Sequence, residues 1–397
     1  MKYAAITERL AQLGGAKWDM HLRARALERA GEEVYSLTIG EPDAPMPPDL
    51  LEVAIDSLRR GRIGYSNGRG EPALVETLAR RYATRTGRAI TTGQILCLPG
   101  TQTVLYAIFM GLTDAGDEVL VGDPMYATYE GIIRASGAVP VPVPLDPENG
   151  FRIRAEDIAA RITAKSRVIF LNSPHNPTGA VLTRDDLLAI GELARVHDLW
   201  IVSDEVYEEL VFDGAEFVSP FDMAHLADRT VVAASISKSH AAPGFRSGWC
   251  VGPEEFCDRL LPVSETMLFG NQPFIADMTA AALALPSPIA PGMRARFAAR
   301  AKLLHDRLHG FCGLRVSQPQ AGMFALVDVS ATGMTGDAFA PALLDATRVA
   351  VMPGGAFGPA LEGWLRLSLT ASDERFSTAV DRIADFAQKL DRERKTA

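Results

Sequence analysis

The sequence predicts an α/β fold in which a mostly parallel sheet lies between helices, and three observations lead to this prediction. Five short apolar segments have the length of buried strands, and they occupy residues 95–98, 118–121, 167–171, 199–203 and 230–234. Each segment is followed by a cluster of glycine, proline or polar residues, as a strand that ends in a loop would be. With 397 residues and 47% hydrophobic residues, the chain is long enough for two or three domains.

The N-terminal segment, residues 1–29, has helical spacing with an expected break at Gly14 and Gly15, and we expect it to pack as an arm. Residues 34–39 then have the pattern of a short strand that stops at Gly40. Because glycine has no side chain, this position would let a ligand approach the backbone, although a simple turn would also explain it.

A helix is expected over residues 50–60, and a glycine-rich loop leads from it into a second helix that has Pro72 in its first turn. The loop contains Tyr65, which taken alone is more typical of a packing residue.

A small-residue turn joins the strand at 95–98 to an apolar helix at 104–112. Gly100, Thr101 and Gln102 lie in this turn, where backbone N–H groups and the positive end of the helix dipole point at one spot. Such an arrangement suits a phosphate, and ordinary capping of the helix by Thr101 is compatible with it.

Polar groups follow two further strands of the predicted sheet. The strand at 167–171 leads to Asn176 in an N-P-T-G segment, which is a turn signal in any protein. Its neighbour His175 is a weak candidate for a general base. The strand at 199–203 leads to Asp204, whose carboxylate could hold a proton on a pyridine nitrogen.

The segment SISKSHAAPGFRSGW carries the main chemical groups of the chain, with Lys238 placed just after the last of the five strands. Doubly wound folds bind ligands at that edge of the sheet. A ligand that uses Lys238 together with Ser235, Ser237 and Arg246 is an aldehyde bearing a phosphate, because the amine can form an imine while hydroxyls and guanidinium hold the phosphate. For an isolated S-x-S-K string, a solvated loop lysine would be the better interpretation.

The C-terminal part is expected to form a second, smaller domain that begins around residues 290–300. Its expected strands and helices occupy residues 314–317, 323–329, 338–347, 349–352, 364–369 and 374–390. Arg366 lies in the middle of an apolar strand, so its guanidinium needs an anionic partner. A substrate carboxylate or an internal ion pair would each supply one.

Composition excludes several classes of partner. A net charge of −9 at pH 7 disfavours nucleic acid and anionic membranes. Four cysteines without C-x-x-C spacing, no export signal and no apolar window of membrane-spanning length lead us to expect a cytoplasmic protein. His305 and His309 lie four residues apart but lack the glutamate of H-E-x-x-H, so we expect no metal site.

The Lys238 segment resembles the pyridoxal-phosphate lysine signature of the class I aminotransferases, the fold type I enzymes. In that signature a phosphate-binding arginine follows S-x-S-K by eight residues, as Arg246 does here. Before it, the N-P-T-G of Asn176 and the D-x-x-Y of Asp204 and Tyr207 stand in the order of the family. The resemblance extends over nearly the whole chain.

This resemblance implies a fold type I pyridoxal-phosphate transferase with three parts. They are an arm and the start of the small domain at 1–45, a large cofactor-binding domain at 46–288, and a smaller α+β domain at 289–397. The large domain would hold a mixed, mostly parallel seven-stranded sheet between helices. A homodimer with shared active sites is also implied, because the tyrosine that Tyr65 matches reaches the cofactor phosphate of the partner subunit in the family.

The resemblance also implies a role for each residue of the site. The catalytic residues would be Lys238, Asp204 and Tyr207. The cofactor-binding residues would be Gly100, Thr101, Gln102, Tyr126, Asn176, Asp204, Tyr207, Ser235, Ser237, Lys238, Arg246 and Tyr65. The substrate-binding residues would be Gly40, Asn176, Arg366 and Trp18. Tyr126 is preferred to Tyr129 as the ring that stacks on the cofactor.

The implied activity is a transamination in which an L-amino acid displaces Lys238 from its Schiff base and a 2-oxo acid accepts the amino group. Pyruvate, oxaloacetate or 2-oxoglutarate could be the acceptor. Carbon–sulfur lyases and oxoamine synthases share the fold, and the sequence separates them poorly. The effector domain of a transcription regulator would need a helix-turn-helix, for which no segment is evident.

The stretches AKWDMHLRA, DPMYATYE and HDLWIVSDEVYEELVFDG resemble arginine–pyruvate transaminases in particular. We therefore hypothesise that Asp19 or another acid at the entrance of the site pairs with a basic substrate side chain, although a helix cap would explain Asp19 at least as well. An aspartate-type transaminase is less expected, because the turn carries Gln102 and no arginine lies between residues 260 and 292.

Overall fold

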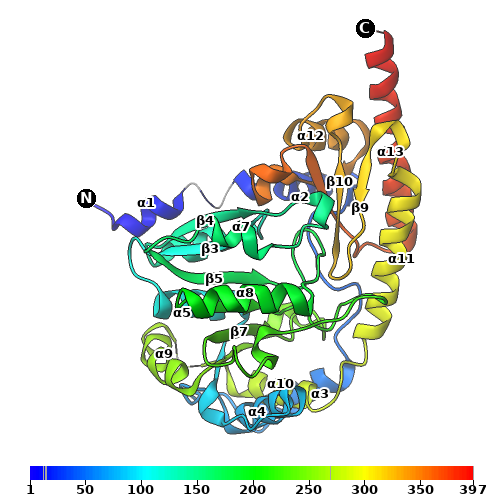
Figure 1. The fold of residues 1–397 in the computed structure, drawn as a ribbon. Helices are drawn as coiled ribbons and strands as arrows, with labels where there is room; N and C mark the ends of the chain where they lie inside the picture. Colours follow the sequence, from blue (N-terminus) through cyan, green and yellow to red (C-terminus); the bar gives the residue numbers. More distant parts are fainter. Residues whose placement is uncertain (12, 14–15, 269, 397) are drawn as a thin grey trace.

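The computed structural model describes residues 1–11, 13, 16–268 and 270–396. Figure 1 shows a layered α/β body that contains the larger sheet, and a smaller α+β region beside it. The expected break at Gly14 and Gly15 lies outside the described residues.

The described helices have the following bounds: α1 Ala5–Ala11, α2 Asp19–Arg29, α3 Pro48–Arg59, α4 Pro72–Thr86, α5 Thr101–Leu112, α6 Tyr129–Ala135, α7 Ala155–Ala159, α8 Arg184–Val196, α9 Glu254–Met267, α10 Pro273–Leu283, α11 Ala290–Leu308, α12 Gly336–Thr347 and α13 Asp373–Thr396. The helices expected at 50–60, after Pro72, at 104–112, at 338–347 and at 374–390 are confirmed as α3, α4, α5, α12 and α13, with ends shifted by a few residues.

The larger sheet has seven strands in the order β2-β8-β7-β6-β5-β3-β4. Their bounds are β2 Ile95–Leu98, β3 Glu118–Asp123, β4 Val139–Pro144, β5 Ser166–Asn172, β6 Trp200–Asp204, β7 Thr230–Ser235 and β8 Gly248–Val251. Neighbours from β7 to β4 pair in parallel, whereas β8 runs antiparallel to both β2 and β7. The prediction of a mixed, mostly parallel sheet is therefore confirmed.

Two strands of this sheet were not predicted, β4 and β8. The sequence of β4 alternates valine with proline, which lacks the N–H group that a central strand must donate. Its place at the edge of the sheet, paired only with β3, makes those prolines tolerable. The four residues of β8 follow the Lys238 loop directly, so no change of pattern marks where the strand begins.

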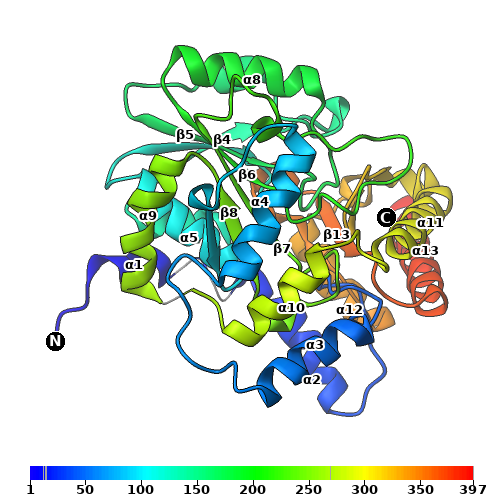
Figure 2. The same cartoon turned by 90° about the horizontal axis from the view of Figure 1, so that it is seen from below.

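Both faces of the larger sheet are buried, which explains why its strands are apolar without alternation. In β5, Ile169 and Leu171 pack in one apolar cluster with residues of α8, whereas Val168 and Phe170 pack in another with residues of α5 and α9. Figure 2 shows α8 on one side of the sheet and α5 and α9 on the other. The helices α4 and α10 pack against β2, β7 and β8, on the other face of these strands from α5 and α9.

The smaller sheet has four antiparallel strands in the order β12-β13-β10-β9. Their bounds are β9 Arg315–Ser317, β10 Phe324–Asp328, β12 Met352–Pro353 and β13 Trp364–Ser368. The helices α11 and α13 lie side by side along this region (Figure 1). The strand expected at 34–39 is shorter, because only β1 Tyr35–Ser36 pairs, with β11 Val349–Ala350.

This pairing matters for function because it attaches the N-terminal segment to the smaller sheet region just before Gly40.

Among the described residues, no helix combines the length and apolar character that a membrane span requires.

Candidate active site

The carboxyl ends of β5, β6 and β7 open onto a cavity of about 250 Å³, at the edge where parallel sheets bind ligands. The predicted site residues that line it are Trp18, Gly40, Thr101, Gln102, Tyr126, Asn176, Asp204, Tyr207, Ser235, Ser237, Lys238, Arg246 and Arg366. Gly100 precedes this lining at the start of α5. Tyr65 is the exception, since it does not line the cavity and its side chain is 94% exposed.

Lys238 follows the end of β7 by three residues, and its Nζ donates a hydrogen bond to the carbonyl oxygen of Gly40 at 3.0 Å. Burial lowers the pKa of this ammonium to about 8, and the positive charges of Arg366 and Arg246 act in the same direction. Near neutral pH the amine is therefore uncharged far more often than that of an ordinary lysine, and the uncharged form is the one that a nucleophile or a base needs.

Gly100 and Arg246 form a tight anion cradle at the start of α5. Gly100 has a φ of 81°, and a Cβ at this position would lie 2.3 Å from Nη2 of Arg246, so no other residue fits. The guanidinium is steadied by a 2.8 Å hydrogen bond from its Nη1 to the carbonyl of Pro243.

The donors around this cradle suit a phosphate group. The hydroxyl of Thr101 is buried and has no hydrogen-bond partner among the described residues. Ser235 and Ser237 are buried and line the same cavity, and the N-terminus of α5 adds its backbone N–H groups. A dianion here would satisfy donors that the protein itself leaves unpaired.

Asp204 ends β6 and is held on both carboxylate oxygens. The hydroxyl of Tyr129 donates to Oδ2 at 2.7 Å, and the N–H of Val206 donates to Oδ1 at 3.1 Å. Burial raises the pKa of Asp204 to about 6, opposed by these two donors and by Lys238. The carboxylate is therefore mostly ionised at neutral pH and faces the cavity as a buried negative charge.

The hydrogen bond from Tyr129 to Asp204 distinguishes the two tyrosines that were candidates for stacking on a ligand ring. Tyr129 is fully engaged with Asp204, and the ring of Tyr126 meets the ring of Tyr129 edge-on at a centroid distance of 5.5 Å. Spacing along the chain could not predict the bond from Tyr129 to Asp204, because it joins the first turn of α6 to a strand 75 residues later.

Arg366 belongs to β13 of the smaller sheet and lines the cavity. Its Nη1 donates to Oδ1 of Asn176 at 3.2 Å, and its Nη2 donates to the carbonyl of Thr38 at 2.7 Å. Among the described residues no carboxylate pairs with this buried guanidinium, and its Nε has no hydrogen-bond partner. Burial lowers the pKa of Arg366 to about 10, so it stays charged at neutral pH.

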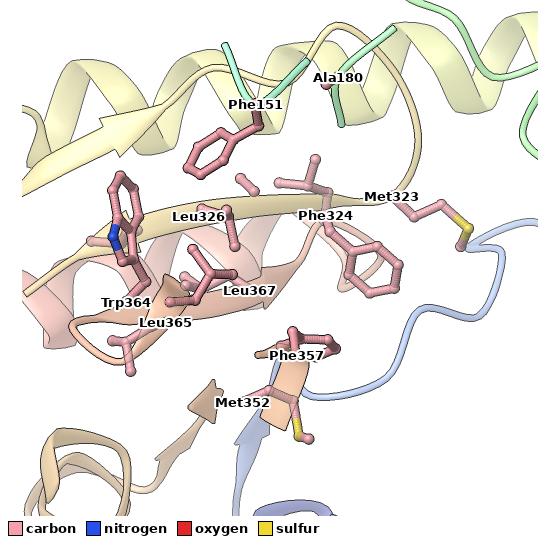
Figure 3. Close-up of a cluster of buried hydrophobic side chains, with 14 of the residues drawn as sticks. Phe151, Ala180, Met323, Phe324, Leu326, Met352, Phe357, Trp364, Leu365 and Leu367 are labelled. Atoms are coloured by element: carbon pink, nitrogen blue, oxygen red, sulfur yellow. The ribbon is translucent and has the colours of Figure 1, made fainter. Parts of the chain in front are cut away.

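The guanidinium of Arg366 is also fixed between two aromatic rings. It lies 3.9 Å from the ring centroid of Phe324 and 4.3 Å from that of Phe357. Both rings belong to the buried apolar cluster around β10 and β13 (Figure 3). A planar cation held in this way presents its remaining donors to a carboxylate in a fixed direction.

Three further residues singled out in the sequence lie outside this cavity. His175 borders a smaller, mostly apolar cavity, its Nδ1 lies 2.7 Å from the hydroxyl of Thr178, and burial lowers its pKa to about 4. His309 accepts a hydrogen bond from the N–H of Val316 and stacks on His305.

Asp19 is exposed and is absent from the cavity lining, although its neighbour Trp18 belongs to it. It occupies the first turn of α2 without a side-chain cap at Trp18. Sequence analysis also missed Glu41 and Phe324, which line the cavity. The glycine and proline around Glu41 had indicated only a turn, and Phe324 begins a strand whose pattern reports burial alone.

Comparison with known proteins gives a consistent picture. The family described as "Aminotransferase class I and II" matches residues 32–383. The arginine–pyruvate transaminase AruH of Pseudomonas aeruginosa is 45% identical over 98% of this chain and 99% of its own length. An aspartate aminotransferase of Geobacillus stearothermophilus is 33% identical over 92% of this chain and 94% of its own.

Solved structures agree with the sequence relatives. An aspartate aminotransferase of Thermus thermophilus, solved with maleate, superposes with a TM-score of 0.90 at 31% identity, covering 97% of this chain and 99% of its own. An aspartate aminotransferase of Rhizobium meliloti gives a TM-score of 0.91 at 28% identity over 98% of this chain and 99% of its own.

Proposed function

The chain belongs to the class I and II aminotransferases, and from this premise we propose that it moves the amino group of a non-acidic L-amino acid, arginine first among them, to pyruvate or a similar 2-oxo acid. The family depends on pyridoxal 5'-phosphate. The single observation that carries the proposal is the convergence of Lys238, Asp204, Arg246 and Arg366 on one cavity.

The cofactor fits the groups present. We assign its phosphate to the cradle of Gly100, Thr101, Gln102, Ser235, Ser237 and Arg246, its ring to Tyr126, Asp204, Asn176 and Tyr207, and its aldehyde to Lys238. When bound, pyridoxal phosphate supplies a carbonyl group that takes up the substrate amine and a ring that accepts electrons from the substrate α-carbon.

Asp204 would keep a proton on the ring nitrogen. Its carboxylate is ionised near neutral pH and is buried, so it stabilises a positive charge beside it. Tyr129 and the N–H of Val206 hold both carboxylate oxygens and thereby fix its direction. Tyr207 lies on the same wall, where its phenol would donate to the ring oxygen.

Lys238 would carry the proton of the reaction. Once the substrate amine has displaced it, its Nζ would act as a base, because burial lowers its pKa to about 8. It would take the proton from the substrate α-carbon and return it at the neighbouring carbon of the cofactor. The hydrogen bond from its Nζ to the carbonyl of Gly40 supports this role, because both residues line the cavity.

Arg366 would bind the substrate α-carboxylate. Its unpaired donors, its lack of a carboxylate partner among the described residues and its position between two aromatic rings all favour an anion from outside the chain. Trp18 and Gly40 would border the rest of the substrate. Asn176 links this carboxylate site to the cofactor site, because it accepts from Nη1 of Arg366.

Arginine is favoured as the donor by the 45% identity to an arginine–pyruvate transaminase. The absence of arginine between residues 260 and 292 disfavours acidic donors, which need a second cation.

We further propose a cytoplasmic homodimer, in which the exposed Tyr65 reaches the partner subunit's phosphate site. Residues 46–288 would bind the cofactor, with 1–45 and 289–397 forming the arm and the small domain. Sedimentation equilibrium tests the dimer, which should have twice the chain mass of 42.8 kDa. A monomer that is fully active would contradict the proposed dimer.

Chemical analysis of the products tests the reaction itself. With arginine and pyruvate, the purified protein should produce alanine and the 2-oxo acid of arginine in equal amounts, without ammonia. Cystathionine should be left intact. Release of ammonia or a thiol without alanine would instead identify a lyase of the same fold.

A further inference from the structure

A short strap, residues 39–43, borders the cavity and is fixed on both sides of Glu41. On one side, the carbonyl of Gly40 accepts the hydrogen bond of Lys238 at 3.0 Å, and a Cβ on Gly40 would lie 2.4 Å from the ring of Phe324. On the other side, Asp43 accepts hydrogen bonds from Arg296 at 2.7 and 2.8 Å and from Arg300 at 2.8 Å. The backbone that carries Glu41 is therefore held in place.

The carboxylate of Glu41 is the charged group of the cavity that the proposed chemistry does not use. Among the described residues that line the cavity, Lys238, Arg246, Arg366 and Asp204 each make a hydrogen bond to the protein. Glu41 lines the same cavity, and within the described part of the chain its carboxylate makes no hydrogen bond or ion pair. It thus offers a negative charge to a ligand.

The neighbouring cations do not neutralise this charge. Lys238, whose ammonium is attracted by Glu41, would be joined to the cofactor aldehyde when a substrate enters, and among the described residues it makes no ion pair with Glu41. The charge of Glu41 also acts on His21. Burial and the charge of Arg25 nevertheless lower the pKa of His21 below its usual 6.5, so its ring is mostly uncharged at pH 7. An incoming cation would therefore meet an unpaired carboxylate.

We propose that Glu41 determines substrate specificity by binding a guanidinium or ammonium group at the end of the substrate side chain. This inference rests on the proposed transaminase function and names the residue that selects its donor. With the α-carboxylate at Arg366 and the reacting amine at Lys238, the substrate side chain would extend past other lining residues of the cavity, which include Trp18, Ile39 and Glu41. A bond from Glu41 to a guanidinium would be charge-assisted.

The geometry favours Glu41 over Asp19, the acid that the sequence had suggested for this role. Both carboxylates are exposed, but Glu41 lines the cavity and Asp19 does not. Asp19 follows Trp18 in the chain, and Glu41 lines the same cavity as Trp18, so the two acids form a matched pair for mutagenesis. Arginine and citrulline form a matched pair of substrates, because citrulline replaces the guanidinium with a neutral ureido group of nearly the same shape.

The experiment measures kcat/KM for arginine and for citrulline in the wild type, in Glu41→Gln and in Asp19→Asn. The wild type should prefer arginine, and Glu41→Gln should lower the arginine-to-citrulline ratio about tenfold, mainly through the KM for arginine. The ratio is the readout because any effect of Glu41 on the basicity of Lys238 acts on both substrates. Asp19→Asn should keep the wild-type ratio.

Charge reversal gives a second test that a merely structural role would not pass. Glu41→Lys should raise the preference for glutamate over glutamine, which differ in the same way as arginine and citrulline. If Glu41→Gln keeps the arginine-to-citrulline ratio, or if Asp19→Asn lowers it instead, the inference is wrong while the transaminase function stands. If the wild type turns over no amino acid at all, the proposed function itself fails.

Discussion

Lys238 combines two features that a free lysine does not have: its amine is buried, and it shares its cavity with two arginines. Together these lower its pKa from the usual 10.5 to about 8. The uncharged amine is the form that attacks an aldehyde, so the local environment sets the pH at which the protein acquires its cofactor.

The rate at which the cofactor-free protein takes up pyridoxal phosphate should therefore rise with pH and reach half its maximum near pH 8. The sign follows from the chemistry, because raising the pH removes the proton that blocks the attack. Stopped-flow absorbance measures this rate. A rate that continues to climb until about pH 10.5 would show an ordinary lysine.

The same pKa predicts a change in stability. Between pH 8 and 10.5 the unfolded chain binds more protons at Lys238 than the folded chain, so this residue makes the cofactor-free protein more stable as the pH rises. Lys238→Met should remove that part of the rise in urea unfolding experiments. An unchanged slope in the variant would contradict the assignment.

Arg366 shows why a planar, fixed cation differs from a flexible one. Arg366→Lys keeps the charge but loses the fork geometry and the stacking between Phe324 and Phe357. We expect kcat/KM for every amino donor to fall by about 10- to 100-fold, with cofactor affinity nearly unchanged.

Arg382→Lys is the matched control for this prediction, because Arg382 also stacks on an aromatic ring, that of Tyr35, but does not line the cavity. It should keep wild-type kinetics. Equal losses in the two variants would mean that general destabilisation, and not carboxylate binding, explains the effect.

Gly100 is a site where the backbone allows only glycine. Gly100→Ala would strain a φ of 81° and push against Arg246, so the dissociation constant of pyridoxal phosphate should rise at least about tenfold. Gly116→Ala separates the two causes, since Gly116 has a φ of 94° with open space around it. It should cost about 1 kcal/mol of stability and leave cofactor affinity unchanged.

At the scale of elements, the site depends on where the strands of the larger sheet end. The sequence was sufficient for five of these strands because burial on both faces gives each of them a continuous apolar segment. Residues that follow directly from such an end, such as Asp204 and Lys238, could be assigned to one edge of the sheet. β4 and β8 escaped prediction because prolines and shortness hide their pattern.

Contacts between distant elements could not be predicted in the same way. Three hydrogen bonds of the site join segments far apart in the chain: from Tyr129 to Asp204, from Arg366 to the carbonyl of Thr38, and from Lys238 to the carbonyl of Gly40 in the strap. Spacing carries no information about such contacts, and a resemblance transfers only the residues that its motifs contain. The cavity's unpaired acid therefore became visible only in the folded chain.

A buried ion cluster joins α4 to the segment just after β6. Arg85 of α4 lies 3.3 Å from the fully buried Glu205, 2.8 Å from Glu208 and 2.9 Å from Asp222. Because Glu205 directly follows Asp204, this cluster supports the strand end that carries the acid of the site. Removing the arginine would take the ion-pair partner from Asp222, and it would leave Glu205 with only Ser219 and Glu208 with only Arg81 as partners among the described residues.

Arg85→Met should therefore lower the free energy of unfolding by about 3 kcal/mol, and should also weaken cofactor binding through the loosened end of β6. Arg195→Met is the control, because Arg195 pairs with Glu192 on the exposed surface of α8. That change should leave the stability almost unaltered. Chemical denaturation distinguishes the two, and a neutral Arg85→Met would rule out the supporting role.

At the scale of the whole molecule, the cavity is built from two sheets that contribute different groups. The larger sheet and its loops supply Lys238, Asp204 and Arg246, whereas Arg366 comes from β13 of the smaller sheet. The N-terminal segment lies between them, because Thr38 holds Arg366 and Gly40 accepts from Lys238. The order of motifs along the chain predicted this set of residues, and their convergence is what the folded structure adds.

The central claim is that Lys238 holds pyridoxal phosphate in this cavity and releases it to a substrate amine. The most direct test is the absorbance spectrum of the purified protein between the near ultraviolet and the blue, before and after a single amino acid is added without any oxo acid. We predict a visible band of lysine-bound cofactor that fades with arginine as the pyridoxamine band grows, and no visible band in Lys238→Ala. A wild-type protein that shows no band after incubation with pyridoxal phosphate, or a band that no amino acid alters, would contradict the account.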